Sequence, residues 1–163
     1  SPSMNVRLKK IVATKAFDQP KRYVFSKELT LDWNAPFFNL PGQKVVVTSK
    51  RSLPKSARKI KNLSLLNCKS KGRFLDPKNF IEKISRFQIN NILLESGPNL
   101  LGSFGDVNLI DEFIFYISPE KLGSQAEYFY KGKNKINFFD NEQFDIVEET
   151  QVGKDKKIVF RKK

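Results

Sequence analysis

Histidine is absent from the 163 residues of this chain, and cysteine occurs only once, at Cys68. The first absence excludes imidazole metal ligands, a Ser-His-Asp triad, a Cys-His pair and acid–base catalysis by histidine. The single cysteine excludes an intramolecular disulfide and any zinc or iron–sulfur site built from several cysteines. Chemistry in this protein must therefore use carboxylates, lysines, hydroxyl groups or a bound cofactor.

Long apolar runs are also missing. No window approaches the roughly 18 apolar residues of a membrane span, and no N-terminal stretch combines a basic region, an apolar run and a small-residue cleavage site. With a single cysteine, these absences favour a cytoplasmic location and no membrane partner. The chain begins Ser1-Pro2-Ser3, with Met4 in fourth place. Either a tag scar precedes Met4 or the sequence was cut from a longer one.

The composition favours one folded domain with negatively charged partners. Hydrophobic residues make up 39% of the chain, including 15 Phe, which is enough for a packed core. The 30 Lys and Arg outnumber the 17 Asp and Glu and give a net charge of +13. This charge favours nucleic acid, a phosphorylated metabolite or a nucleotide cofactor as partner. The alternative is a generally lysine-rich surface without a specific partner, because the lysines are scattered along the whole chain. However, Trp33 and the four tyrosines are not interleaved with the basic stretch 50–61, which argues against nucleic acid.

Strands and helices are expected to alternate along the chain. Runs of β-branched, aromatic or aliphatic residues predict strands at 22–31, 44–49, 63–66, 91–95, 111–119, 144–151 and 156–161. Asp76-Pro77 predicts the start of one helix, and a second is expected after Gly97. The stretch 50–61 is expected to be a solvated loop or short helix. The order predicts an α/β fold with a mostly parallel central sheet, flanking helices and a C-terminal antiparallel β-hairpin. The strand at 111–119 is apolar on both faces and is expected to be central.

The strongest candidate for a ligand site is the run Glu-Ser-Gly-Pro-Asn-Leu-Leu-Gly-Ser from Glu95 to Ser103. A carboxylate at the end of a predicted strand faces the crevice where parallel sheets bind ligands. Gly97 permits close approach of the backbone, and the following helix offers unpaired N–H groups and a positive dipole end to phosphate. The pattern is neither a full dinucleotide fingerprint nor a P-loop. An ordinary strand-to-helix turn is the structural alternative.

Other candidate residues have simpler structural interpretations. Asp111 and Glu112 begin a predicted strand, so alternation directs their side chains to opposite faces rather than into one carboxylate pair. Cys68 lacks a histidine base and is expected to be a small buried residue. The acid-rich stretch 140–149 is expected to be a solvated strand edge.

Two motifs together resemble a known family. Residues 92–104 read Ile-Leu-Leu-Glu-Ser-Gly-Pro-Asn-Leu-Leu-Gly-Ser-Phe, and residues 109–123 read Leu-Ile-Asp-Glu-Phe-Ile-Phe-Tyr-Ile-Ser-Pro-Glu-Lys-Leu-Gly. Their order and spacing resemble the C-terminal reductase domain of the bifunctional riboflavin-biosynthesis deaminase/reductase. That family shows Glu-Gly/Ala-Gly-Pro-x-Leu, then Leu-Val-Asp-Glu and Pro-x-Leu-Leu-Gly. Weaker matches are residues 19–26, where Phe25 replaces an aspartate, and residues 2–7, where Met4 replaces a leucine. Ser1, just before the second of these matches, stands in the place of another aspartate of the family.

The resemblance extends over residues 1–163, as a single but partial reductase domain. It runs through Ser1, which favours a cut chain over a tag scar. The zinc deaminase domain of the family would be absent, and so would the first part of the reductase domain. The resemblance implies a fold like that of dihydrofolate reductase and a homodimer. It also implies NADPH-dependent reduction of the phosphorylated pyrimidine 5-amino-6-(5-phosphoribosylamino)uracil, which opens the ribose to a ribityl chain.

Site residues follow from the same resemblance. Met4, Arg7 and Glu95 would contact the substrate, with Arg7 as a partner of its phosphate. Ser26 would lie near the cofactor. The residues implied to hold the NADPH phosphates are Gly97, Pro98, Asn99, Leu100, Leu101, Gly102 and Ser103. No proton donor is identified. The alternatives are a reductase of this fold for another pyrimidine or pteridine-like substrate, an inactive fragment, and a basic nucleic-acid-binding module.

Overall fold

The computed structural model describes residues 19–134, 136 and 143–163, and the expectations for Met4 and Arg7 lie outside these residues. The chain divides into two compact units, residues 1–86 and residues 87–163, and each is described by itself. Within the described residues, no helix has the length and apolar character needed to cross a membrane. The expectation of one domain over residues 1–163 stays a prediction.

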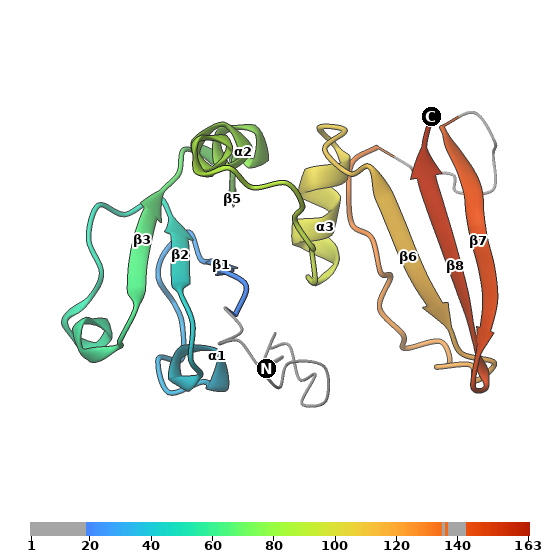
Figure 1. Cartoon of the computed structure of the whole chain (residues 1–163), viewed down its shortest axis with the longest axis horizontal. Helices are drawn as coiled ribbons and strands as arrows, with labels where there is room; N and C mark the ends of the chain where they lie inside the picture. The colour runs from blue at the N-terminus through green and yellow to red at the C-terminus, as the bar shows by residue number, and fades with distance from the viewer. Residues whose placement is uncertain (1–18, 135, 137–142) are drawn as a thin grey trace, which may run out of the picture. The chain divides into compact units, whose positions relative to one another are not determined.

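The first unit is built on a parallel sheet of three strands, β1 (Arg22–Phe25), β2 (Lys44–Thr48) and β3 (Leu63–Asn67), in the order β1-β2-β3 (Figure 1). Val24 lies opposite Val46, and Val46 lies opposite Leu65. Every residue of β2 is buried, because this strand is covered on both faces and paired along both edges. An uninterrupted apolar run flanked by turns is typical of such a strand, and the prediction at 44–49 is confirmed.

Helices cover the two faces of this sheet. On one face, Phe37 and Phe38 of α1 (Pro36–Asn39) pack in a cluster with Val46. The alternate residues of β1 meet α2 (Pro77–Ile84), where the ring of Phe80 lies 5.4 Å from that of Tyr23 and 4.8 Å from that of Phe25. Both ring pairs are edge-to-face, the arrangement that aromatic quadrupoles favour. The period-two alternation of β1 thus supplies both halves of the core.

The connections of the first unit include one helix start that the sequence predicted and one hairpin that it did not predict. Asp76 caps α2, since its Oδ1 accepts a hydrogen bond from the N–H of Lys78 at 3.0 Å, and Pro77 occupies the first helical position. The basic stretch 50–61 contains the 3₁₀ helix η1 (Lys55–Lys59), and η2 (Ser85–Phe87) follows α2. The unpredicted hairpin joins β4 (Ser70–Lys71) to β5 (Phe74–Leu75). Two-residue strands are too short to leave a periodic signal.

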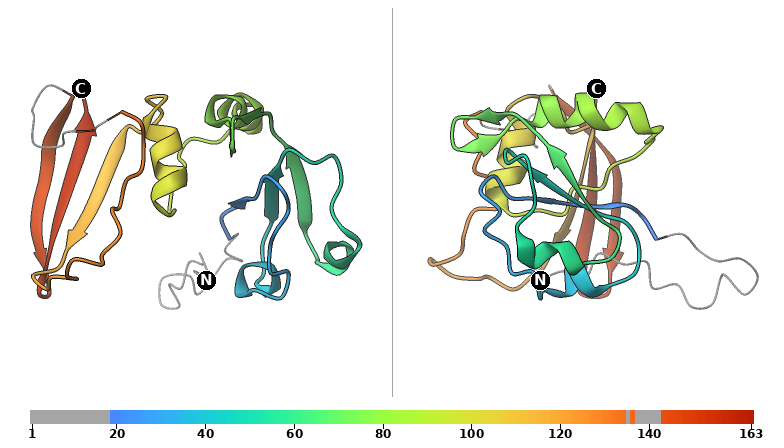
Figure 2. Two further views of the ribbon diagram at one scale, coloured as in Figure 1. Left: turned by 180° about the vertical axis from the view of Figure 1, so that it is seen from behind. Right: turned by 90° about the vertical axis from the view of Figure 1, so that its left-hand side faces the viewer.

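The second unit contains helix α3 (Pro98–Gly105) and an antiparallel sheet of β6 (Glu112–Ile117), β8 (Asp155–Lys162) and β7 (Phe144–Val152), in that order. Figure 2 shows the three strands side by side. The turn between β7 and β8 contains Gly153, with φ of +61°, so the predicted C-terminal hairpin is confirmed. The core consists of Phe113, Phe144, Ile158 and Phe160, and Leu101 of α3 packs against it.

Three expectations about strands were wrong. Residues 91–95 form no strand, and Ile92 and Leu93 are 48% and 71% exposed. A strand needs a neighbour that accepts its backbone hydrogen bonds, and none of the described strands pairs with this segment. Strand β6 lies at the edge of its sheet rather than at its centre. Strand β1 ends at Phe25 instead of near Leu31, because the chain turns at Leu29, whose φ is +62°.

Candidate functional site

The turn into α3 is the centre of the candidate site. Gly97 is the N-cap residue, with φ of −71° and ψ of 169°, and its carbonyl accepts a hydrogen bond from the N–H of Leu101 at 3.2 Å. No side chain caps the helix, and its first turn holds no acidic residue. Pro98 has no N–H, so the first-turn donors are the amides of Asn99 and Leu100, which have no acceptor within the helix. The helix N-terminus is therefore available to an anion.

The space around this turn suits a phosphate group. A Cβ placed on Gly97 would meet no heavy atom within 4 Å, so the backbone is open to close approach. The Oγ of Ser96 is buried and finds no hydrogen-bond partner among the described residues. A buried hydroxyl without a partner costs free energy that a polar ligand would recover. Both observations agree with the binding of cofactor phosphates that the resemblance implies for this run.

Glu95 stands two residues before the cap and is exposed. Its carboxylate follows an unpaired segment rather than the end of a strand, so the sheet does not fix its direction. No described residue forms an ion pair with it. It is an accessible anion beside the helix turn, suited to accept hydrogen bonds from N–H or O–H groups of a ligand.

The second half of the run Gly97–Ser103 faces the protein instead of solvent. A Cβ on Gly102 would lie 2.4 Å from the backbone nitrogen of Gly132, so only glycine fits there. The side chain of Leu101 packs on the phenylalanine core, and the Oγ of Ser103 donates to the carbonyl of Leu100 at 2.8 Å. In this structure Gly97, Asn99 and Leu100 line the open end of the turn, and the later residues anchor the helix.

Ser26 belongs to the first unit, directly after β1. It is buried, and its N–H donates to the carbonyl of Val47 at 2.9 Å, which extends the parallel ladder by one bond. Ser26 therefore lies at the carboxyl edge of the parallel sheet, the edge at which such sheets bind ligands.

Comparison with known proteins places this geometry in a family. The model of the family described as RibD C-terminal domain matches residues 1–156. The chain belongs to the RibD C-terminal domain family. The resemblance read from the sequence is thereby confirmed.

Curated relatives of this RibD C-terminal domain come from several bacteria. The riboflavin biosynthesis protein RibD of Buchnera aphidicola subsp. Baizongia pistaciae is 41% identical over 98 residues, which are 60% of this chain and 26% of the relative. The 5-amino-6-(5-phosphoribosylamino)uracil reductase of Buchnera aphidicola subsp. Acyrthosiphon pisum is 27% identical over all of this chain and 81% of its own length. The chain thus spans about a quarter of the RibD relative.

Solved structures show the same fold. Form 2 of RibD from Acinetobacter baumannii matches with a TM-score of 0.78 and 21% identity, over 99% of this chain and 43% of that one. The riboflavin biosynthesis reductase Rib7 of Saccharomyces cerevisiae matches with a TM-score of 0.68 and 15% identity, over 89% of this chain and 71% of that one. The predicted α/β fold is confirmed, with its parallel sheet and its antiparallel hairpin.

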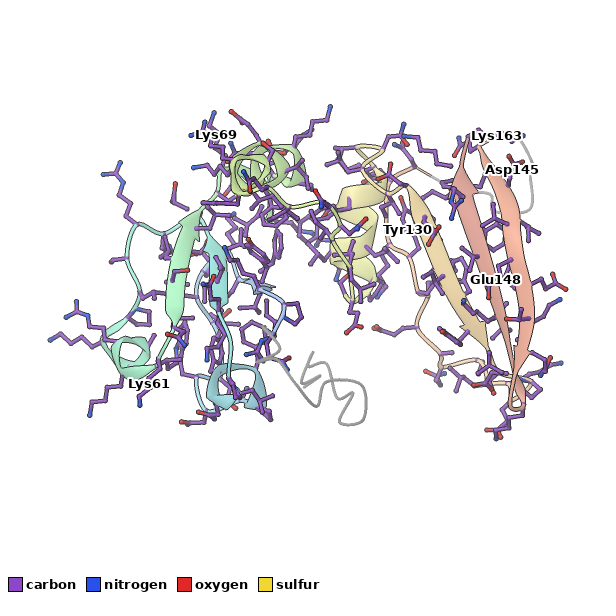
Figure 3. All side chains as sticks on the ribbon, in the orientation of Figure 1. Lys61, Lys69, Tyr130, Asp145, Glu148 and Lys163 are labelled. Carbon is purple, nitrogen blue, oxygen red and sulfur yellow. The ribbon has the colours of Figure 1, made fainter. Side chains whose placement is uncertain are left out.

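A polar network that the sequence did not reveal holds α3 in the RibD C-terminal domain. Asp106 at the end of α3 accepts hydrogen bonds from the Tyr130 hydroxyl at 3.4 Å and from the N–H of Asn134 at 2.9 Å. The N–H of Lys131 donates to the carbonyl of Pro98 at 3.1 Å, and Figure 3 shows Tyr130 beside α3. The sequence holds a glycine in each of the two segments, Gly102 and Gly132, where their backbones approach each other. Two glycines 30 residues apart do not by themselves predict a contact, so the network could not be read from the sequence.

The network shifts the acidity of both side chains. Burial raises the pKa of Asp106, but hydrogen bonds from the backbone of Lys133 and Asn134 and from Tyr130 outweigh it, so its pKa is lowered overall. Burial, the charge of Asp106 and the hydrogen bond to it together raise the pKa of Tyr130 to about 12. Asp106 is thus an anion and Tyr130 a neutral donor throughout the neutral range.

Substituting Gly102 by Ala should destabilise the protein by roughly 1–3 kcal/mol, because the added Cβ overlaps the backbone of Gly132. Gly97→Ala is the matched control, since the same methyl group enters open space, and its effect should be within about 0.5 kcal/mol. Urea unfolding of both variants measures the difference. Equal stability of the two variants would contradict the close approach of these segments.

Alkaline pH should weaken the fold through Tyr130. The pKa of Tyr130 is raised in the folded protein, so its neutral hydroxyl contributes to the free energy of unfolding. This contribution is complete below the ordinary pKa of about 10 and is lost as the pH rises from about 10 to about 12. Melting temperature measured across this range should therefore fall more for the unmodified chain than for Tyr130→Phe. Parallel curves for the two proteins would show that the hydroxyl is not held by Asp106.

Proposed function

We propose that this domain reduces 5-amino-6-(5-phosphoribosylamino)uracil with NADPH in riboflavin biosynthesis. The observation that carries the proposal is the family match over residues 1–156, supported by a relative of that name that aligns with the whole chain. The uncapped, open turn at Gly97 agrees with a bound dinucleotide phosphate. Reductases of this family use a nicotinamide cofactor, and the specific choice of NADPH is part of the proposal.

The chain's own residues would bind and orient the reactants. The amides of Asn99 and Leu100 and the hydroxyl of Ser96 would receive a cofactor phosphate, while Pro98 fixes the start of the helix. When bound, the nicotinamide supplies hydride to the sugar C1 of the ring-opened substrate. The Glu95 carboxylate would accept hydrogen bonds from the substrate and fix its orientation. With no histidine in the chain, catalysis would rest on positioning and on the electrostatics of the helix turn.

The remaining assignments keep their roles within the proposal. Met4 and Arg7 would complete the substrate site, with the Arg7 guanidinium on the substrate phosphate. Ser26 would contact the cofactor from the edge of the parallel sheet. Leu101, Gly102 and Ser103 would act through the placement of α3, because the structure packs them inward. A cytoplasmic location is proposed with the activity.

We also propose that the domain forms a homodimer. Ile114 and Tyr116 of β6 lie on the face opposite the core residue Phe113, and they are 47% and 62% exposed. Val159 of β8 pairs with Ile114 but is buried, so the exposed apolar residues of this face come from β6. Exposed apolar residues gathered on one sheet face are typical of a surface that a second protein covers.

Glu95→Gln should impair use of the substrate more than binding of the cofactor, because it removes the charge that strengthens hydrogen bonds to the substrate. We expect kcat/KM for the pyrimidine to fall about tenfold, with the dissociation constant of NADPH unchanged. Glu149→Gln, on β7, is the matched control. Steady-state kinetics and fluorescence titration with NADPH measure the two effects, and equal losses in both would refute the assignment of Glu95.

Tyr116→Glu should shift the protein toward monomer, since a carboxylate at a covered apolar face is costly to bury. Sedimentation equilibrium of the variant against the unmodified chain measures the change. Tyr128→Glu serves as control, because Tyr128 is exposed outside the sheet. An unmodified chain that is monomeric at all concentrations would refute the homodimer.

A further inference from the structure

The positive charge of the chain is concentrated in its first unit. Residues 33–75 hold ten Lys and Arg and no Asp or Glu. In the second unit, residues 87–163, ten Lys and Arg stand against twelve Asp and Glu. The net charge of +13 therefore comes entirely from residues 1–86. An excess of one charge confined to one half of a chain is typical of a surface that binds a polyanion.

The densest group of these cations lies on and beside the 3₁₀ helix η1, between β2 and β3. Five exposed basic side chains make up what we call the η1 surface: Arg51, Lys55, Arg58, Lys59 and Lys61. Figure 3 labels Lys61 close to the start of β3. In the part of the chain that the structure describes, no carboxylate forms an ion pair with any of the five. Their charge is therefore available to an external anion.

The backbone beneath the η1 surface is fixed by apolar contacts. Ala57 is fully buried, and Leu53 and Ile60 pack against the core cluster that contains the rings of α1. The N–H of Ile60 donates to the carbonyl of Ala57 at 3.1 Å. Residues three apart lie above one another in a 3₁₀ helix, so the inward pair Ala57 and Ile60 leaves Lys55 and Arg58 on the outer side. A fixed backbone reduces the entropy that is lost on binding.

The polar character of the η1 surface favours nucleic acid over a protein or a membrane. Among the described residues, the first large hydrophobic side chain that is exposed is Phe74, so none lies within 50–62. Protein interfaces and membrane-bound segments both need apolar groups at their centre. Between the cations stand the exposed side chains of Ser52, Ser56 and Asn62. Hydroxyl and amide groups interspersed with Lys and Arg are the side chains that contact phosphate oxygens of nucleic acids.

Aromatic rings are missing from the η1 surface. The stretch 50–62 contains no Phe, Tyr or Trp. The ring of Trp33 lies 5.0 Å from that of Phe38 and packs in the core cluster. Binding of single strands relies on rings that stack on unpaired bases, whereas a duplex offers its phosphates without such rings. The surface therefore suits the backbone of a double helix, and the lack of rings excludes only recognition by stacking.

We propose that the η1 surface binds the phosphate backbone of double-stranded nucleic acid without regard to its sequence. The inference goes beyond the proposed function and does not rest on it. Each phosphate that a Lys or Arg neutralises releases a condensed counterion, and this release supplies most of the binding free energy. Binding also relieves the repulsion among five unpaired cations on one short segment. The phosphodiester backbone is common to DNA and RNA, so the chemistry of the surface admits both.

Fluorescence anisotropy of the full chain with a labelled DNA duplex and a labelled RNA duplex tests the inference. Measured between about 50 and 200 mM salt, the logarithm of the association constant for DNA should fall against the logarithm of salt concentration with a slope of about −4, as expected for five cations on phosphates. The double variant Lys55→Gln/Lys59→Gln should reduce the magnitude of this slope by about 2. The matched control Lys78→Gln/Lys121→Gln removes two exposed lysines outside the η1 surface and should keep the slope. Thermal melting checks that both variants are folded.

The outcomes separate this inference from the proposed function. No binding of either duplex, or equal losses in the two double variants, would overturn the inference and leave the reductase activity untouched. Displacement of the duplex by polyglutamate as readily as by unlabelled duplex would indicate an acidic protein as partner and overturn the inference. Displacement by NADPH would place the duplex at the cofactor site and overturn it as well. Duplex binding that depends on Lys55 and Lys59, in a chain that reduces no pyrimidine, would support the inference and overturn the proposed activity.

Discussion

The candidate site depends on the close contact between helix α3 and the segment Tyr130–Asn134. At Gly102 this contact leaves no room for a side chain, and a hydrogen bond from Lys131 to Pro98 continues it to the first turn. Asp106 fastens the other end of the helix through Tyr130 and Asn134. The helix is thus held at both ends by one segment, while Leu101 packs on the sheet. Its free N-terminal amides therefore keep a fixed direction, which is what a phosphate site requires of them.

The basic side chains at the two edges of the first unit's parallel sheet differ in their burial. At its amino edge, Arg22 and Lys44 are buried, and both donate to the carbonyl of Leu40. Burial lowers the pKa of each, and the charge of Arg22 lowers that of Lys44 further. These two buried side chains donate hydrogen bonds to the turn before β2. At the carboxyl edge Lys69 is exposed, Lys50 pairs with Glu28, and Lys27 donates to the carbonyl of Gly72.

The sequence predicted those elements whose signals are local. The cap at Asp76, the buried run of β2 and the glycine turn before β8 each depend on a few neighbouring residues, and all three appear in the structure. The strand predicted at 91–95 is absent because a strand needs a second segment to pair with. A local sequence pattern does not show whether such a segment is present. The central position predicted for β6 was wrong for the same reason, since this strand lies at the edge of its sheet.

The site could be read from the sequence only in part. The half of the site that is open to solvent, at Gly97, could be predicted from the glycine turn and the dipole of the helix that follows it. The inward half does not, because Gly102 looks the same in sequence whether it faces a phosphate or the backbone of Gly132.

The chemistry of the chain agrees with a protein that positions reactants rather than forming bonds to them. Its single thiol, Cys68, is buried and donates to the carbonyl of Asp76, and burial raises its pKa. A thiol held neutral is a poor nucleophile, and no histidine exists to activate a hydroxyl. The groups that remain are backbone amides, carboxylates and ammonium groups, all of which bind and orient. A cofactor that brings its own redox chemistry is the reactant that such a set of groups can use.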